Sequence, residues 1–333
     1  MASLTVVMPA HNSASTIVAA IESVLCQSYP DFELWVLENG SSDRTLDVAR
    51  SFTDPRVKVF DLGSIGFQES LAFALENSQA EWLARMDADD LIFPDRFKIQ
   101  MEAIEEHPEV VLVGTQRAYL TPFGHIFEPT ATVSSRHVGH LNLRLKGEDR
   151  KFFIDASVIF NRSFALEVGG YDPEFEMGDV PLWFRILSKG EGWEIAEPLY
   201  LYRLNPKSMS FSKTKQSDQS YRLVRKYAPQ LLPLYAENPA SSSNNSEQSF
   251  WFEVAKWEYL AGDHKSVLQA ADFLEQEGPF EKKANQLRWL VRMGLLGRII
   301  YGIRMGKSGP LYRHRPDWEE VFTSLVGSLD PVS

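Results

Sequence analysis

The sequence has a single cysteine in 333 residues, so no disulfide bond can form within the chain. Disulfides are typical of small secreted domains, and their absence is typical of proteins from a reducing compartment. The one thiol, Cys26, directly follows the apolar run Ile17 to Leu25, and we expect it to be packed and inert. We therefore expect a cytoplasmic protein, and its 44% hydrophobic residues are enough to build a sizeable core.

Long apolar runs are also lacking. No stretch of about 18 uncharged apolar residues occurs, so we expect no transmembrane helix. The N-terminal residues Met1 to Leu4 enter a strand-like run without a basic region and an apolar core, so we expect no signal peptide. Positive charge is not in excess either, because the formal net charge is −11. An acidic chain repels the phosphate backbone, so we expect no nucleic-acid partner.

What the first hundred residues do contain is an alternation of short β-rich runs with segments of helical periodicity. The expected strands and helices are 4–8, 14–27, 32–37, 45–52, 57–60, 67–77 and 82–86. Such alternation with short connections predicts right-handed crossovers and a mainly parallel sheet. The glycine fingerprint of a dinucleotide fold is missing, because the first strand runs into Pro9-Ala10-His11-Asn12.

Polar residues gather where three of these strands are expected to end. They are His11-Asn12, Glu38 to Asp43 and Asp87-Ala88-Asp89-Asp90. In a parallel sheet, ligands bind at the carboxyl ends of the strands. Alternation in an extended chain would place Asp87 and Asp89 on one face, and neighbouring carboxylates repel unless a hard cation such as Mg²⁺ or Mn²⁺ binds them. The sequence therefore predicts a metal site at this edge.

The composition divides the chain into three parts. We expect a first domain over residues 1–235, a linker rich in Ser and Asn over 236–249, and a helical region over 250–333. The helical region should contain a hairpin and then a basic helical segment that reaches Arg315. That segment can dock its apolar stripe on the catalytic domain, or it can lie on an anionic membrane surface as a peripheral contact.

Several motifs occur together and in a fixed order. They are Val7 to Asn12, Glu38 to Thr45, Ala84 to Asp90, Pro94-x-Arg96-x-x-x-Gln100, Gly169 to Phe175, Asp179-x-x-Leu182-Trp183-x-Arg185 and Leu201-Tyr202-Arg203. With this set, residues 3–212 resemble family 2 glycosyltransferases of bacterial polysaccharide and lipopolysaccharide assembly. The resemblance implies an α/β GT-A fold, Rossmann-like with helices on both sides of the sheet, to which this chain adds a C-terminal helical extension.

The same resemblance implies an activity and assigns roles to residues. The activity would be transfer, with inversion, of a sugar from a nucleotide-diphospho-sugar donor to a glycan or lipid-linked acceptor. The nucleotide-binding residues would be Pro9, Ala10, Asn12, Glu38, Arg85 and Asp87. Among them, Ala10 and Glu38 would contact the base and Asp87 would lie near the ribose. Asp89 would bind the Mn²⁺ or Mg²⁺ ion, and Asp179 would be the general base.

Alternatives remain for some of these assignments. Asp179 precedes Val180-Pro181, a typical helix start, and can serve as an N-cap. Arg85 can hold a phosphate or pair with the aspartates. The sequence also departs from the family pattern at three positions, Gly178, Asn205 and Asp155. These departures leave a second hypothesis, a non-catalytic protein that keeps the fold and uses the C-terminal helices for partner contact.

Overall fold

The computed structural model describes residues 2–129, 134–138, 155–175, 179–205, 226–227, 247–276, 281–293, 312–327 and 329. Its strands are β1 (Leu4–Ala10), β2 (Phe32–Glu38), β3 (Val57–Asp61), β4 (Trp82–Arg85), β5 (Leu91–Ile92), β6 (Val110–Leu120), β7 (Ile126–Pro129), β8 (Arg136–Val138), β9 (Ile159–Asn161), β10 (Glu191–Arg203) and β11 (Tyr312–His314). Its helices are α1 (Ile17–Leu25), α2 (Thr45–Arg50), α3 (Phe67–Asn77), α4 (Arg96–Glu106), α5 (Arg162–Glu167), α6 (Val180–Lys189), α9 (Glu247–Ala261), α10 (His264–Gln276), α11 (Glu281–Arg292) and α13 (Pro316–Val326).

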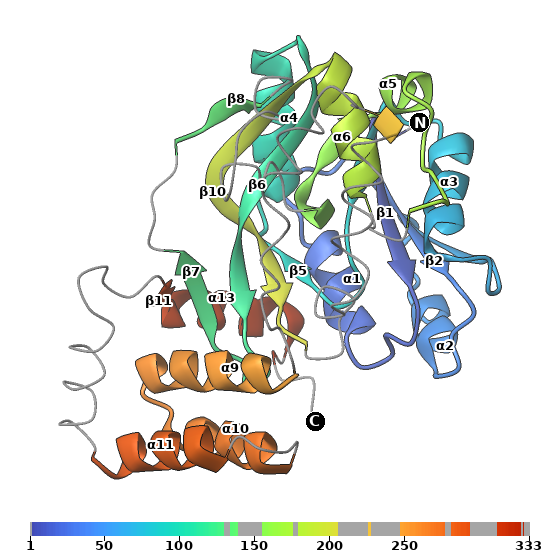
Figure 1. Cartoon of the computed structure of the whole chain (residues 1–333). Coiled ribbons are helices and arrows are strands. Elements are labelled where there is room, and N and C mark those ends of the chain that lie inside the picture. Colours follow the sequence, from blue (N-terminus) through green and yellow to red (C-terminus); the bar gives the residue numbers. More distant parts are fainter. Residues whose placement is uncertain are drawn as a thin grey trace.

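A single mixed sheet forms the centre of the molecule, in the order β11-β7-β6-β9-β4-β1-β2-β3 (Figure 1). Strands β3, β2, β1 and β4 are parallel to one another, and β9 lies between β4 and β6 and is antiparallel to both. Strand β10 lies beside this path and pairs with β5, β6 and β8. The parallel sheet expected for the first hundred residues is therefore confirmed, and its strands and helices begin and end within a few residues of the expected positions.

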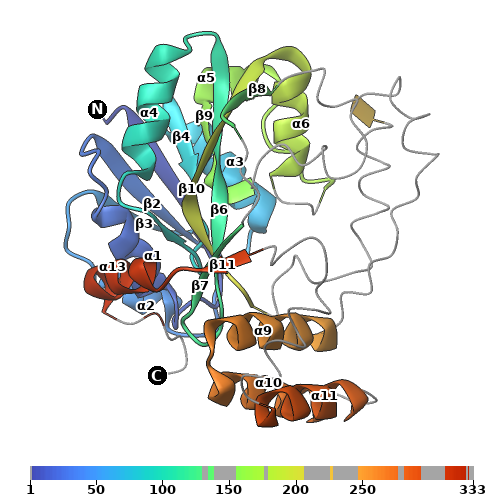
Figure 2. The same cartoon turned by 90° about the vertical axis from the view of Figure 1, so that its left-hand side faces the viewer.

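Helices cover both faces of the sheet, with α1 and α4 on one side and α3, α5 and α6 on the other (Figure 2). Alternate side chains of β1 fill the two cores: Val6 and Met8 pack with α1 and α4, whereas Val7 packs with α3 and α6. Burial on both faces explains why this strand is apolar at nearly every position. The expectation for Cys26 is wrong, because α1 ends at Leu25 and the thiol lies exposed just beyond the buried stripe of the helix.

The expected helical hairpin is present as α9 and α10 (Figure 1). Helix α11 buries Ala284, Leu287 and Leu290 in the same core as these two helices, and this core includes Leu204 next to the end of β10. In the described part of the basic segment, these three apolar residues are thus covered by α9 and α10, whereas Trp289 is exposed. No helix among the residues that the structure describes is both long enough and apolar enough to span a membrane.

The expectation of a helical segment up to Arg315 is wrong at its end. Residues Tyr312–His314 form β11, which pairs antiparallel with β7, because the open edge of a sheet offers unpaired backbone groups. Arg313 and Arg315 both form ion pairs with Glu128 of β7. Positive charge that the sequence presents as a basic surface is therefore partly neutralised within the fold.

The chain after β11 returns to the first part of the molecule. Helix α13 lies beside α1 (Figure 2), and its Phe322 is fully buried with Leu91 of β5 and Leu201 of β10. Most of the expected linker at 236–249 lies outside the described residues, so the division into domains stays a prediction. The region after that linker contributes a helical hairpin and also a strand and a helix of the main body.

A buried carboxylate connects the helical hairpin to the sheet. Glu258 of α9 is completely buried, and its Oε2 lies 2.5 Å from Nδ1 of His125 in the turn between β6 and β7. The hydrogen bond to Glu258 raises the pKa of His125, against a smaller opposing effect of burial.

We expect His125→Gln to destabilise the protein most at low pH. A raised folded pKa makes the contribution of His125 fully present below the unfolded value of ~6.5, and this contribution is lost as the pH rises through the folded pKa. Melting temperatures of wild type and variant should therefore converge as the pH rises from the unfolded pKa of about 6.5 through the raised folded pKa. His264→Gln, which alters a histidine without an ion pair among the described residues, is the matched control. A difference that widens with pH would contradict the assignment.

Candidate functional site

The loops that follow β1, β2 and β4 meet at one edge of the sheet because these strands are adjacent and parallel. The register places Ala10 opposite Glu38 across the first two strands, and Val7 opposite Arg85 across β1 and β4. The backbone N–H of Asn39 donates to the carbonyl of Ala10 at 2.9 Å, which continues the pairing past the strand ends. Of the residues assigned from the sequence, this edge holds Pro9, Ala10, Asn12, Glu38, Arg85, Asp87 and Asp89.

Asn12 fastens the first of these loops to the second. It is the one described non-glycine residue with a positive φ, 51°, a conformation that Asn tolerates better than most residues. Its Oδ1 accepts a hydrogen bond from the N–H of Ser42 at 2.8 Å, and its own N–H donates to Oγ of Ser41 at 2.9 Å. The two loops therefore form one bonded unit beside the end of β1.

Glu38 gives the second loop its shape. Its side chain is buried, and its two oxygens accept the backbone N–H groups of Ser41 at 2.6 Å and Gly40 at 3.2 Å. Gly40 has a φ of +69°, and a Cβ there would lie only 2.1 Å from Oγ of Ser64, so the turn requires glycine. The hydrogen bonds of Glu38 thus stabilise the conformation of the loop that follows β2.

The three aspartates after β4 converge. Ligand oxygens of Asp87, Asp89 and Asp90 all lie within 4.8 Å of one another. Burial, followed by the charge of Asp87, raises the pKa of Asp89 to about 6. Burial and the charges of Asp89 and Asp87 also raise the pKa of Asp90. Carboxylates that are costly to ionise next to each other are the donor set that fits Mg²⁺ or Mn²⁺, which take oxygen ligands and offset this repulsion.

Strand β10 fixes the last aspartate of the three. The hydroxyl of Tyr200 donates to Oδ2 of Asp90 at 2.7 Å, and the backbone N–H of Arg203 donates to Oδ1 at 2.7 Å. The Arg203 side chain also donates through Nε to the backbone carbonyl of Asp89 at 2.9 Å. Both oxygens of Asp90 are thus occupied, whereas Asp89 forms no ion pair among the described residues, so Asp89 is the carboxylate that is most available to a cation.

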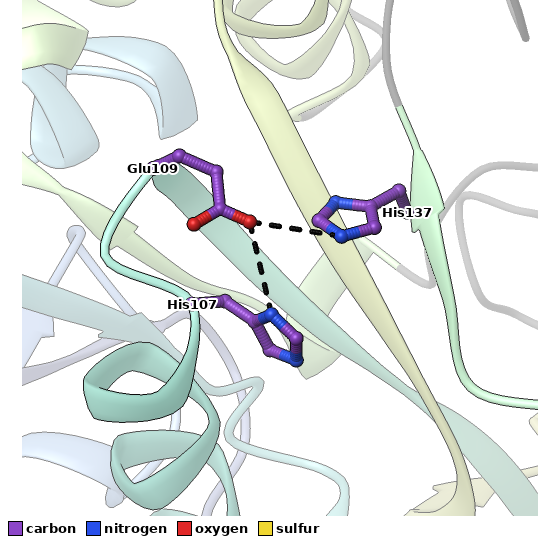
Figure 3. Close-up of side chains that lie close together, drawn as sticks. All are labelled: His107, Glu109 and His137. Atoms are coloured by element: carbon purple, nitrogen blue, oxygen red, sulfur yellow. Dashed lines mark ion pairs between the residues drawn. The ribbon is translucent and has the colours of Figure 1, made fainter.

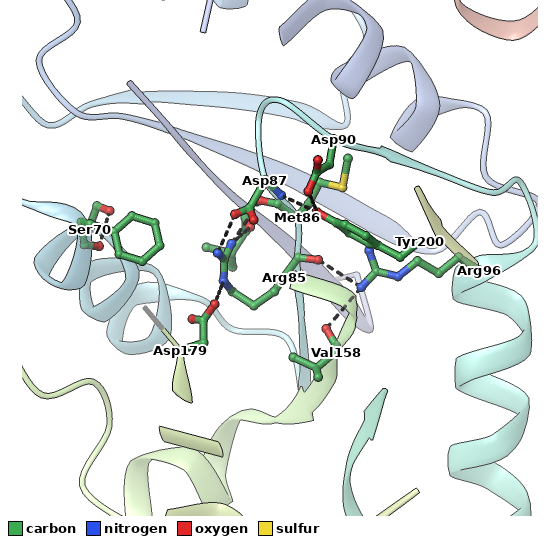
Figure 4. Close-up of polar contacts among 11 residues, drawn as sticks. Ser70, Arg85, Met86, Asp87, Asp90, Arg96, Val158, Asp179 and Tyr200 are labelled. Carbon is green, nitrogen blue, oxygen red and sulfur yellow. Dashed lines mark hydrogen bonds and ion pairs between the residues drawn. The ribbon is translucent and has the colours of Figure 1, made fainter. Parts of the chain in front are cut away.

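Arg85 joins the aspartate cluster to Asp179, as Figure 4 shows. Its guanidinium is buried and donates through Nε to Oδ2 of Asp179 at 2.7 Å and through NH2 to Oδ1 of Asp87 at 2.9 Å. Burial lowers the pKa of Arg85, but the charges of Asp179 and Asp87 outweigh burial and raise it. Of the two roles considered for Arg85, the structure shows the pairing with aspartates.

Asp179 stands at the N-cap position of α6, but its side chain makes no capping hydrogen bond. The carboxylate turns to Arg85 instead, and its Oδ1 is buried without a hydrogen-bond partner among the described residues. Burial raises the pKa of Asp179, and the charge of Arg85 opposes this effect only in part. Among the described residues, Oδ1 is therefore the oxygen of Asp179 that Arg85 does not hold, and Arg85 connects this carboxylate to Asp87 through two ion pairs.

A buried pair below the site was not singled out individually from the sequence. Arg96 is fully buried and donates to the backbone carbonyl of Arg85 at 3.0 Å and to Oε1 of Gln100 at 2.9 Å. Burial lowers the pKa of Arg96 to about 10. A spacing of four residues places Arg96 and Gln100 on one face of α4, which is a usable signal. Tyr200, by contrast, is an aromatic residue in an apolar strand and gives no such signal.

The three departures from the family pattern lie around this centre. Asn205 is half-buried and follows β10 two residues after Arg203. Asp155 begins a short 3₁₀ turn, Asp155–Ser157, before β9, and nothing is described of its side chain. Gly178 lies outside the described residues.

Removing the charge of Arg85 should destabilise the fold strongly. We expect Arg85→Met to lower the free energy of unfolding by about 3–5 kcal/mol, because two carboxylates would lose their buried partner. Urea denaturation measures this loss. The matched control is Arg50→Met, which breaks an exposed pair with Asp61 and should cost less than about 1 kcal/mol. An equal decrease in the free energy of unfolding in both variants would show that the buried ion pairs of Arg85 stabilise the fold no more than an exposed pair does.

Asp89→Asn should have opposite effects without and with metal. In EDTA at neutral pH, we expect the variant to melt at a higher temperature than wild type. Burial raises the folded pKa of Asp89 to about 6, so its ionised form, which is present at neutral pH, destabilises the folded state, whereas asparagine carries no charge. With Mn²⁺, wild type should gain stability and the variant should gain little. Differential scanning fluorimetry measures the melting temperatures of both proteins in EDTA and in Mn²⁺. If Mn²⁺ did not change the melting temperature of wild type, the metal assignment would be contradicted.

Comparison with known proteins is consistent with this geometry. Residues 5–169 match the profile described as glycosyl transferase family 2. Putative glycosyltransferase EpsE of Bacillus subtilis is 28% identical over 60% of this chain and 72% of its own length. O-antigen biosynthesis glycosyltransferase WbnJ of Escherichia coli is 26% identical over 62% of this chain and 81% of its own length.

Solved structures share the fold. TarS of S. aureus in complex with UDP-GlcNAc aligns with a TM-score of 0.55 and 16% identity, over 89% of this chain and 88% of that chain. The mannosyltransferase PcManGT of Pyrobaculum calidifontis, in complex with GDP-Man and Mn²⁺, aligns with a TM-score of 0.51 and 15% identity, over 99% and 85% of the two chains. The fold is GT-A, and the chain is a glycosyltransferase that belongs to glycosyl transferase family 2.

Proposed function

We propose that this glycosyltransferase transfers a sugar, with inversion and with the help of a divalent metal ion, from a nucleotide-diphospho-sugar donor to a hydroxyl group of a glycan or lipid-linked acceptor. The observation that supports this most directly is the chain of contacts Asp87–Arg85–Asp179. It connects the carboxylates suited to a metal with a buried carboxylate whose Oδ1 is not held by Arg85.

The donor would bind across the ends of β1, β2 and β4. Structures of the same fold hold UDP-GlcNAc in TarS and GDP-Man with Mn²⁺ in PcManGT, which supports this class of donor. Pro9, Ala10 and Asn12 would line the nucleotide side, with Asp87 near the ribose. Glu38 would contribute by holding the loop Asn39 to Ser42 in the conformation that faces the base.

The diphosphate leaving group must be stabilised as the glycosidic bond breaks. A Mn²⁺ or Mg²⁺ ion held by Asp89 would neutralise the charge that develops on that group, in place of a proton donor. Asp90 would keep the Asp89 backbone in place through its bonds to Tyr200 and Arg203. Arg85 would limit the repulsion between Asp87 and the neighbouring carboxylates by pairing with Asp87.

Asp179 would act as the general base. An acceptor hydroxyl is a poor nucleophile until its proton is removed in the transition state, and a carboxylate with a raised pKa is better suited to accept this proton. Its Oδ2 is held by Arg85, so Oδ1 would take the proton. A single base opposite the leaving group fits one in-line displacement, which inverts the anomeric carbon.

The acceptor class rests on the relatives. WbnJ is named for O-antigen biosynthesis, and a 32% identical relative of Erwinia amylovora, AmsE, is named for amylovoran biosynthesis. Both names refer to the biosynthesis of polysaccharides, so we propose a glycan or a lipid-linked glycan precursor as the acceptor. The basic C-terminal segment is not needed for this proposal, since the apolar stripe of α11 is buried against α9 and α10.

Two substitutions should separate chemistry from donor binding. We expect Asp179→Asn to lower kcat by about 10²–10⁴, because an amide cannot take the proton of the acceptor. Donor binding should be retained, because the amide oxygen can still accept the hydrogen bond of Arg85 and Asp87 keeps its ion pair with Arg85. Asp89→Asn should instead weaken Mn²⁺-dependent donor binding. Asp61→Asn, at the end of β3 on the same edge, is the matched control and should leave both quantities nearly unchanged. Turnover with a matched acceptor and donor titration would measure them, and an unimpaired Asp179→Asn enzyme would exclude this residue as the base.

A thermal-shift panel tests the donor class independently of the acceptor. Nucleoside diphosphates and nucleotide sugars that bind only the native state should raise its melting temperature according to RT ln(1 + [L]/Kd). We expect such shifts with Mn²⁺ and much smaller shifts in EDTA. Nucleoside monophosphates and free sugars serve as controls, and equal shifts with and without the metal would argue against a metal-bridged diphosphate.

A further inference from the structure

A second group of potential metal ligands lies far from the aspartate cluster. It consists of His107, Glu109 and His137, which we call the His–Glu–His group (Figure 3). His107 and Glu109 belong to the turn between α4 and β6, and His137 belongs to β8. One oxygen, Oε1 of Glu109, lies 3.7 Å from Nδ1 of His107 and 3.6 Å from Nε2 of His137. Two imidazole nitrogens and a carboxylate oxygen therefore point to the same space.

These separations are too long for hydrogen bonds and fit a shared ion. Two ligand atoms that each lie about 2.0–2.1 Å from a tetrahedral Zn²⁺ are separated by roughly 3.3–3.4 Å. The observed separations of 3.6 and 3.7 Å exceed this by only a few tenths of an ångström. Within the part of the chain that the structure describes, these three side chains form no hydrogen bond that would compete with binding of an ion. The ion pairs themselves are at least a quarter exposed, and such pairs contribute little to stability.

The three side chains are held in place by rigid surroundings. Pro108 restricts the turn between His107 and Glu109, and the N–H of Val110 donates to the carbonyl of His107 at 3.0 Å. His137 pairs across the sheet with Trp193 of β10. The Trp193 indole stacks on the His107 ring, with centroids 3.9 Å apart, and meets the His137 ring edge-on at 4.7 Å. The ligands are therefore preorganised rather than gathered from flexible loops.

We propose that the His–Glu–His group binds a Zn²⁺-like divalent ion and so cross-links β8 to the turn between α4 and β6. Imidazole nitrogens favour Zn²⁺ over the hard ions Mg²⁺ and Mn²⁺, so this site differs in chemistry from the aspartate cluster. It also differs in place, because Trp193 and Arg203 lie ten residues apart on β10, which corresponds to roughly 30 Å along an extended strand. Three protein ligands leave a fourth position for water or a further ligand.

Titration of the full chain with ZnCl₂ tests the proposal. The protein is first stripped with EDTA and exchanged into buffer with excess Mg²⁺, which occupies the aspartate cluster and binds imidazole poorly. Isothermal titration calorimetry should then show one Zn²⁺ per chain for wild type. We expect His107→Gln and His137→Gln each to weaken this binding at least about tenfold. Circular dichroism of each variant confirms that the fold is retained.

Controls distinguish this site from other histidines. His264→Gln should leave Zn²⁺ binding unchanged. His125→Gln should do the same, because His125 belongs to a separate group with Glu258 and Asp263. Substitution with Co²⁺ gives an independent readout, since visible d–d bands of a four- or five-coordinate ion should appear in wild type and be lost in His137→Gln. Three results would each overturn the proposal: no Zn²⁺ binding by wild type, binding by both site variants that is as tight as in wild type, or loss of binding only in His125→Gln.

Discussion

The buried guanidinium of Arg85 is the constraint on which the site depends. Asp87 and Asp179 come from segments more than ninety residues apart. Asp179 is buried and Asp87 is partly exposed, and without the buried cation between them their approach would be unfavourable. Arg85 permits this approach because its planar fork contacts both carboxylates and two backbone carbonyls, those of Val7 and Met86. Helix α6 is thereby fixed against β4, and Asp179 is fixed relative to the aspartates that follow β4.

Buried hydrogen bonds of Arg96 and Gln100 support the position of Arg85. Arg96 bonds to the carbonyl of Arg85, and Gln100 holds Arg96 while it also donates to the carbonyls of Val113 and Ser157. A second arginine behind the first carries a further positive charge into the core, and burial accordingly lowers its pKa. The protein tolerates this because nearly every donor of the pair is satisfied by a carbonyl or a carboxylate.

The sequence was sufficient for the parallel half of the sheet and for the location of the acidic edge. Short β-rich runs that alternate with helical segments indicate the first four strands, and polar residues such as Glu38 and Asp87 stand where these strands end. The antiparallel strand β9 and the edge strand β11 are harder to predict from the sequence, because a strand of three residues is too short to show a periodic pattern. Contacts that depend on distant segments, such as Tyr200 with Asp90 or His125 with Glu258, have no local signature at all.

The contact between Arg203 and Leu329 has a consequence for biosynthesis. NH1 of Arg203 donates to the backbone carbonyl of Leu329 at 2.9 Å, while the same residue holds Asp89 and Asp90. A nascent chain folds from its N-terminus as it emerges from the ribosome. The acidic edge is thus present in the chain once Asp90 has been made, but Arg203, which holds Asp89 and Asp90, can bond to Leu329 only after all the residues between Asp90 and Leu329 have been made.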